Sequence, residues 1–233
     1  MNKQSFSLKQ LLDKHIEALY TLNFQLKLVA INEPWDKSKP APKLYIGKTI
    51  DGTLIHRIGC GVSLENIIKI EHYLMKETFY DKIEYLQEYS EILESKKQTE
   101  EIIYYYDNEQ KQIIENCSKI NEDNIKDYVL DDFDWLNDEI KYCQPCYGIV
   151  KDGRIISICR SVRVTNESHE AGIETNEKHR GNNLARKVLI QWATEVQNGG
   201  FIPFYSTFRE NIASQRVAEK TFLKKIGIGI SID

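Results

Sequence analysis

The chain has 233 residues, of which 41% are hydrophobic and 28% charged, and its formal net charge is −4. It is too apolar for a disordered chain and long enough for one large domain or two small ones. The mild negative charge argues against a dedicated DNA- or RNA-binding protein, which would carry a clear basic excess.

The charged residues are spread unevenly along the chain. Residues 1–115 and 116–153 both carry an acidic excess, whereas residues 154–233 carry 12 basic and 8 acidic groups. Seven of the eight arginines fall between Arg154 and Arg216. Donors of this planar, permanently charged kind, which are suited to phosphate, are therefore gathered in the last third of the chain.

Apolar runs and cysteines indicate the compartment. No run approaches the roughly 20 apolar residues that a membrane helix needs, so we expect a cytoplasmic protein that does not bind membranes. The odd number of cysteines, five, predicts reduced thiols. Cys143 and Cys146 form a C-x-x-C that is typical of a redox pair or half a zinc site. Since no second pair of ligands completes a zinc site, we favour two half-buried thiols and predict no metal.

The first half of the chain predicts both helices and strands. A helix at residues 8–20 precedes an extended run at 26–31, and Asp51-Gly52 marks the turn of a hairpin. Two further helices, one capped by Ser63 and one at about 81–97, precede the β-rich residues 101–106. No motif is identified in residues 1–115, so we expect an accessory N-terminal α/β domain there, with a degenerate related domain as the open alternative.

The second half alternates more regularly. Residues 121–138 predict an acidic helix with one apolar face. Strands are then predicted at 146–150, 155–164, 171–175, 201–207 and 226–232, with helices at 183–197 and 211–224. This order predicts a second α/β domain over residues 116–233.

The segment AGIETNEKHRGNNLARKVLIQW predicts a strand, a polar loop and a helix. A helix that opens after such a turn presents unpaired N–H groups and a positive dipole end, which is a site for pyrophosphate. The basic residues near this helix start are Lys178, His179, Arg180, Arg186 and Lys187. Two interpretations stay open, a bound polyanion and a solvated basic face. The loop is neither G-x-G-x-x-G nor a Walker A sequence.

The residues Arg180-Gly181-Asn182-Asn183-Leu184-Ala185 resemble the Q/R-x-x-G-x-G/A loop of the GCN5-related N-acetyltransferase (GNAT) superfamily. Downstream, Asn211 and Ser214 resemble its N-x-x-A/S helix, and FYSTFRENIASQRVAEK is similar to the zwittermicin A resistance type of acetyltransferase. Asn183 replaces the usual middle glycine, but asparagine adopts positive φ more readily than other non-glycine residues, so the turn is expected to survive. The resemblance implies a mixed, mostly antiparallel sheet flanked by helices over residues 116–233.

The resemblance also implies an activity. It is that of an N-acetyltransferase that uses acetyl-CoA as co-substrate and acetylates a primary amine of a small molecule, such as an antibiotic, a polyamine or an amino compound. The implied coenzyme-binding residues are Ile173 and Thr175 for pantetheine, Arg180, Gly181, Asn182, Asn183, Leu184 and Ala185 for pyrophosphate, and Asn211 and Ser214 beside the arm. The alternative is a regulatory module that binds coenzyme A with weak catalysis. A homodimer is an open alternative to a monomer.

Catalytic candidates follow from the same resemblance. An attacking amine must lose a proton, and Glu174 is the candidate base, with Glu170 in reserve. An exposed strand carboxylate is the alternative interpretation of Glu174. The usual acid, a tyrosine, corresponds to Ala218 here, so Tyr205 and Ser206 are the candidate donors to the leaving thiolate. The acidic residues 122–138 are expected either to attract a cationic acceptor or to form a solvated helix face.

Overall fold

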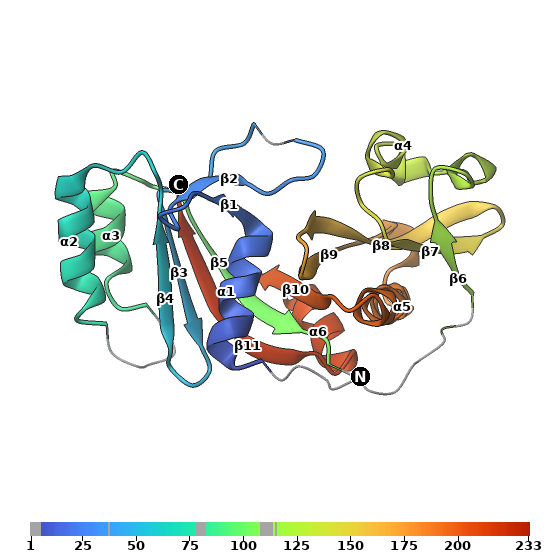
Figure 1. Ribbon diagram of the computed structural model, residues 1–233. Coiled ribbons are helices and arrows are strands. Elements are labelled where there is room, and N and C mark those ends of the chain that lie inside the picture. Colours follow the sequence, from blue (N-terminus) through green and yellow to red (C-terminus); the bar gives the residue numbers. More distant parts are fainter. Residues whose placement is uncertain (1–5, 37, 78–82, 108–113, 115) are drawn as a thin grey trace. The chain divides into compact units, whose positions relative to one another are not determined.

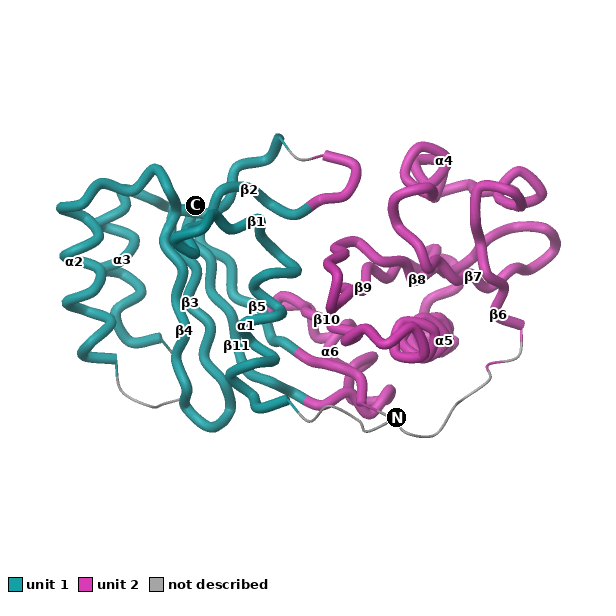
Figure 2. Tube along the Cα trace, viewed as in Figure 1, with its two compact units in different colours: residues 1–32, 37–103, 225–233 teal, residues 33–36, 104–224 magenta. Residues whose placement is uncertain are grey.

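The computed structural model describes residues 6–36, 38–77, 83–107, 114 and 116–233. The chain forms two compact units, which Figure 2 colours separately. Unit 1 comprises residues 1–32, 37–103 and 225–233, and unit 2 comprises residues 33–36 and 104–224. The division predicted at 115/116 stays a prediction, and the compact units divide the chain elsewhere. The last nine residues belong to unit 1 because they form a strand that pairs with β3.

Unit 1 is an antiparallel sheet with helices on both faces. Its elements are α1 (Leu8–Leu19), β1 (Tyr20–Leu22), β2 (Leu28–Ile31), β3 (Leu44–Thr49), β4 (Leu54–Ile58), α2 (Leu64–Leu74), α3 (Leu86–Ile92), most of β5 (Gln98–Tyr105) and most of β11 (Lys224–Ile232). The strand order is β4-β3-β11-β5, and β1 pairs with β2 separately. In Figure 1, α2 and α3 lie on one side of these strands and α1 on the other.

Unit 2 contains the segment with the predicted site. Its elements are β6 (Cys117–Ile120), the 3-10 turns η1 (Ile125–Asp127) and η2 (Asp131–Phe133), α4 (Leu136–Glu139), β7 (Cys146–Lys151), β8 (Arg154–Val164), β9 (Ser168–Thr175), η3 (Glu177–His179), α5 (Leu184–Asn198), β10 (Ile202–Phe208) and α6 (Ile212–Lys220). The strand order is β10-β9-β8-β7-β6. The pairs β6–β7, β7–β8 and β8–β9 are antiparallel and β9–β10 is parallel. The expected α/β fold with a mixed, mostly antiparallel sheet flanked by helices is therefore confirmed.

Two layers cover the strands of unit 2. The apolar face of α5 is buried at Val188, Leu189, Trp192 and Val196, as its helical spacing predicts. Figure 1 shows α4 on the opposite side of β7 and β8. Buried side chains of this second layer include Ile125, Phe133 and Leu136, which pack with Ile158 of β8. The two sides of β8 and β9 therefore face different surroundings.

The prediction of one continuous helix at residues 121–138 is wrong. The segment instead forms η1, η2 and α4, separated by irregular backbone. Asp131 has φ of 47°, which an α-helix cannot contain, and Val129 makes an isolated bridge to Arg154. The guanidinium group of Arg154 donates to both carboxylate oxygens of Asp131, at 2.7 and 2.8 Å. These contacts pull the acidic segment toward β8 and replace the continuous helix.

No helix among the described residues is long and apolar enough to cross a membrane.

Candidate functional site

Strands β9 and β10 part after three paired residues. Their parallel register joins Ile202 to Ser168, Pro203 to His169 and Phe204 to Glu170, and goes no further. On its other edge β9 stays paired with β8 as far as Thr175. Within the described residues, the β9 edge from Ala171 to Thr175 therefore has no paired strand. We call this the open edge.

Backbone direction decides which amides face the open edge. Asn176 donates its N–H to the carbonyl of Ile156 at 2.9 Å, so this amide points toward β8. Because successive residues of a strand direct their N–H groups to opposite edges, Ile173 and Thr175 direct theirs to the open edge. The two residues predicted to bind pantetheine thus carry amides available to a ligand on that side.

A buried carboxylate lies where the strands part. Glu170 is only 3% exposed, and its Oε1 accepts a hydrogen bond from the backbone N–H of Ser206 at 2.6 Å. The contact ties β9 to β10 at the beginning of the open edge. Glu170, the reserve candidate for the base, therefore lies between β9 and β10. It is hydrogen-bonded to the backbone of Ser206, a candidate acid.

The loop after β9 reaches α5 through two left-handed residues. Gly181 has φ of 83°, and Asn183 has φ of 57° and ψ of 20°. The expectation that asparagine takes the left-handed conformation at this turn is confirmed. In the described chain no side-chain hydrogen bond from Asn183 caps α5; its Oδ1 instead accepts from Lys220 Nζ at 3.2 Å. The first amides of α5 are therefore left for an anion.

A pocket of about 500 Å³ adjoins this helix start. It is lined by Asn183, Arg186, Glu219, Lys220 and Phe222. The Nε of Arg186 donates to the carbonyl of Lys220 at 2.8 Å, which joins the start of α5 to the end of α6. Phe222 is 77% exposed, so the pocket combines two cations with an accessible aromatic ring.

The start of α6 brings three predicted residues together. The Oδ1 of Asn211 accepts from the backbone N–H of Ser214 at 3.1 Å and caps the helix. Ser214 lies near the Tyr205 hydroxyl and lowers its pKa, but burial has the larger effect and raises the pKa of Tyr205 to about 12. A hydroxyl that keeps its proton across the physiological range is suited to donating a hydrogen bond.

Glu174 is held by a cation that the sequence analysis did not single out. Arg160 of β8 donates from Nη1 to Glu174 Oε1 at 2.9 Å. The same guanidinium lies 4.0 Å from the ring centroid of Trp135 and 3.6 Å from Glu139 Oε2. No local motif signals this group, since its members come from separate segments joined by the register of the sheet.

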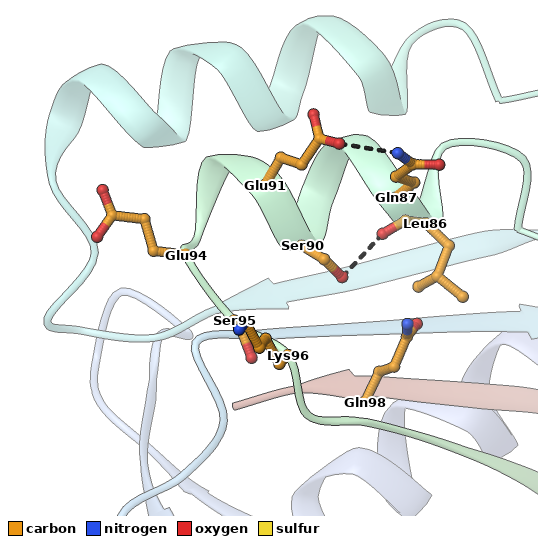
Figure 3. Close-up of a pocket in the computed structure, with 8 residues that line it drawn as sticks. All are labelled: Leu86, Gln87, Ser90, Glu91, Glu94, Ser95, Lys96 and Gln98. Atoms are coloured by element: carbon orange, nitrogen blue, oxygen red, sulfur yellow. Dashed lines mark hydrogen bonds between the residues drawn. The ribbon is translucent and has the colours of Figure 1, made fainter.

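The remaining candidates are separate from the open edge. Cys143 and Cys146 are buried free thiols, so the half-buried environment expected for them is wrong. Among the described residues no group of three potential metal ligands occurs. Another pocket, of about 660 Å³, is lined by residues 86–98 of unit 1 and contains none of the predicted site residues. Figure 3 shows its polar wall, where Gln87 donates to Glu91 and Ser90 to the carbonyl of Leu86.

Comparison with known proteins gives a family match. The family profile described as GNAT acetyltransferase matches residues 65–222, and no curated protein matches the chain. One similar structure, an acetyltransferase from the GNAT family from Colwellia psychrerythraea, is 13% identical with a TM-score of 0.47, and the alignment covers 81% of each chain. A GCN5-related N-acetyltransferase-like protein from Streptococcus suis is 14% identical with a TM-score of 0.46, over 85% of this chain and 86% of that one.

A third structure, assigned to the GNAT family from Novosphingobium aromaticivorans, is 13% identical with a TM-score of 0.47. The alignment covers 59% of this chain and 65% of that one, slightly less than two thirds of its length. Structural similarity at this level carries no information about substrate.

Proposed function

Because the chain belongs to the GNAT acetyltransferase family, we propose that it transfers the acetyl group of acetyl-CoA to a primary amine of a small molecule. The observation that carries the proposal is the open edge of β9, which leads into the left-handed turn at the start of α5. Free strand amides followed by free helix amides suit an elongated ligand with a phosphorylated end.

The chain offers partners for each part of acetyl-CoA. The amides of Ile173 and Thr175 are proposed to bind the pantetheine arm, and those of residues 180–185 the pyrophosphate. The pocket beside Asn183 offers Arg186 and Lys220 to further phosphate oxygens and Phe222 to the base. Asn211 and Ser214 are proposed to lie beside the arm, near the thioester.

The acetyl transfer itself needs two proton movements. The acceptor ammonium loses a proton to Glu174 and then attacks the thioester carbonyl, so that a C–N bond forms and the C–S bond breaks. The hydroxyl of Tyr205 or Ser206 is proposed to donate to the leaving thiolate, which ends as a free thiol. The nitrogen gives up its second proton, so one proton is released in the net reaction.

The identity of the acceptor is a finer proposal. The acidic segment around η1 and η2 favours a cationic amine, such as a polyamine or an aminated antibiotic. The similarity of residues 204–220 to the zwittermicin A resistance type supports the antibiotic. We further propose a cytoplasmic location, no metal, no nucleic-acid or membrane partner, and a homodimer as the alternative to a monomer.

Two measurements test the proposed function. Acetyl-CoA at about 100 times its Kd should stabilise the fold by about 2.7 kcal/mol and raise Tm, and adenosine should do so less. A panel of polyamines and aminated antibiotics should then release free thiol from acetyl-CoA. If acetyl-CoA leaves Tm unchanged, the coenzyme site is refuted. A raised Tm without thiol release from any amine would favour the weakly catalytic binding module.

A further inference from the structure

The Arg160 side chain is the centre of a charged and aromatic cluster in unit 2. We define the Arg160 cluster as Arg160, Glu139, Glu174, Trp35 and Trp135. The guanidinium contacts Glu174 at 2.9 Å and Glu139 at 3.6 Å, and lies 4.0 and 5.9 Å from the rings of Trp135 and Trp35. Its side chain is only 10% exposed. An arginine held in this way has a fixed plane and fixed donor directions.

The two carboxylates share one cation unequally. Glu174 is 45% exposed and lies within hydrogen-bond distance of the guanidinium, whereas Glu139 is 22% exposed and lies farther away. Burial raises the pKa of Glu139, and the negative charges of Glu174 and Glu33 raise it further against the lowering effect of Arg160. The protonation of Glu139 is therefore coupled to the charge of Glu174 across a shared guanidinium.

The cluster adjoins the open edge. Glu174 lies between Ile173 and Thr175, and its partner across the sheet is Ile158 of β8. Cross-strand partners share a face of the sheet, so Glu174 stands on the face that carries Ile158 and α4. Arg160 lies two residues beyond Ile158 and shares that face. Arg160 thus belongs to β8 and contacts Glu139 of α4, and its guanidinium binds the carboxylate of Glu174 on β9.

We propose that Arg160 is a positioning residue that fixes Glu174 beside the open edge, where Glu174, with Glu139 as the second carboxylate on the same guanidinium, takes a proton from the acceptor amine. The inference rests on the proposed function. The pair takes one proton from the acceptor ammonium, which leaves a neutral amine to attack the thioester carbonyl. The proton then leaves the pair to water through the half-exposed Glu174.

Several other groups face this pair and contribute to its titration. Glu33 lies near Glu139 and is bonded to Arg163 at 3.1 Å. The thiols of Cys143 and Cys146 interact with Arg160, and the pKa of Cys143 is lowered chiefly by its hydrogen bond to Cys146. The pKa of Cys159 is raised by burial. His169 also titrates in the acidic range, since burial lowers its pKa to about 4, and it bonds the Ser161 hydroxyl that accepts from Trp192. Because this contribution is common to the wild type and the variants, the difference between their midpoints reports the carboxylates.

The first test needs no acceptor. Two of the three tryptophans flank Arg160, so tryptophan emission is followed between about pH 4 and pH 8, with circular dichroism recorded alongside. Arg160→Gln should move the emission midpoint upward by about one pH unit or more, since the opposite charge is lost. Arg154→Gln is the matched control, because Arg154 lies on the same strand, β8, and its ion pair with Asp131 is exposed. An unmoved midpoint in Arg160→Gln, or an equal shift in Arg154→Gln, overturns the proposal.

Isosteric variants keep the test usable if Arg160→Gln does not fold. Glu139→Gln removes a like charge from beside Glu174, so the midpoint should fall below that of the wild type. Arg160→Lys keeps the charge and loses the planar fork, so the midpoint should move less than in Arg160→Gln. A Glu139→Gln midpoint equal to that of the wild type overturns the pairing.

Binding and turnover separate this proposal from the proposed function. Acetyl-CoA should raise Tm equally in wild type and Arg160→Gln; if it raises neither, the proposed function fails, while the emission midpoints still decide the pairing. With an amine from the acceptor panel, the acid limb of kcat/KM should move upward in Arg160→Gln by the same shift, with the KM for acetyl-CoA unchanged. An acid limb that stays in place overturns the positioning role.

Discussion

Asn183 occupies a position where the backbone requires a left-handed residue. Asparagine accepts this conformation at lower cost than other residues with a side chain, and its Oδ1 also accepts a hydrogen bond from Lys220. The sequence allowed this prediction because the turn chemistry is local. The contact with Lys220 was not predictable, since it depends on where α6 ends relative to α5.

Asn183→Ala tests the importance of this conformation. We expect the free energy of unfolding to fall by about 1 kcal/mol, because alanine adopts positive φ less readily. If the strain also displaces the α5 amides, acetyl-CoA affinity should fall by about tenfold for each 1.4 kcal/mol lost from binding. Urea unfolding and the acetyl-CoA thermal shift measure the two effects. Asn183→Gly is the control and should retain both; a Gly variant as weak as the Ala variant would contradict the explanation.

His169 makes stability depend on pH. Its Nδ1 is hydrogen-bonded to Ser161 Oγ at 2.9 Å, and burial lowers its pKa to about 4. Because the unfolded chain binds this proton more readily than the folded one, stability present above pH 6.5 is lost as pH falls toward 4. At pH 5 the loss should be about 2 kcal/mol, measured by urea unfolding. His169→Gln should remove this part of the pH dependence; an unchanged pH profile would refute the assignment.

At the scale of elements, strands and helices with a clear apolar period were predicted well. The boundaries of α5 differ by one residue from those expected, because Asn183 and the glycines after residue 198 mark both ends. The helix expected at 211–224 ends at Lys220 instead, since Phe222 has φ of 58° and Lys224 already begins β11. The helix expected at 81–97 is α3, Leu86–Ile92, and residues 81–82 of that expectation lie outside the described residues.

The residues of the candidate site also fall into two groups, those that the sequence predicts and those that it does not. The loop and Asn211 are local motifs, so the sequence sufficed to predict them. The Arg160 cluster is non-local, because Arg160 meets Glu174 through the β8–β9 register and Trp135 through the irregular segment that was expected to be a helix. Composition and periodicity carry no information on such contacts.

The cap of α6 provides a test at this scale. Asn211→Ala should lower the free energy of unfolding by about 1 kcal/mol, because the helix loses the oxygen that accepts from the Ser214 amide. It should also displace Ser214 from its place near the Tyr205 hydroxyl, so the thiol-release rate should fall more than acetyl-CoA affinity. Urea unfolding and initial rates measure both. Asn211→Asp retains a capping oxygen and should restore stability; failure to do so would refute the capping role.

At the scale of the whole molecule, the informative element is β11, which belongs mostly to unit 1 but follows the segments of unit 2 in the sequence. It lies between β3 and β5 in the sheet of unit 1, with Ile226, Ile230 and Ile232 buried. All three tryptophans, Trp35, Trp135 and Trp192, belong to unit 2. Tryptophan emission therefore reports unit 2, while circular dichroism reports both units.

Deletion of residues 225–233 should separate these signals. Unit 1 loses an internal strand with several buried isoleucines, each worth about 1.5–3 kcal/mol, which is a large share of the stability of a domain. We expect lower ellipticity and rapid proteolysis within residues 8–103, with the native tryptophan emission retained. Ile230→Val, a milder change in the same strand, should leave the resistance to proteolysis intact. Full resistance in the truncated chain would contradict the role of β11.

The position of β11 also orders events during protein synthesis. A ribosome releases the chain from its N-terminus, yet the sheet of unit 1 has a gap between β3 and β5 until residues 225–233 emerge. All segments of unit 2 are made before that point. The unit that is translated first is consequently the one that completes its fold last, and until then its unpaired strand edges are the part of the nascent chain most in need of a chaperone.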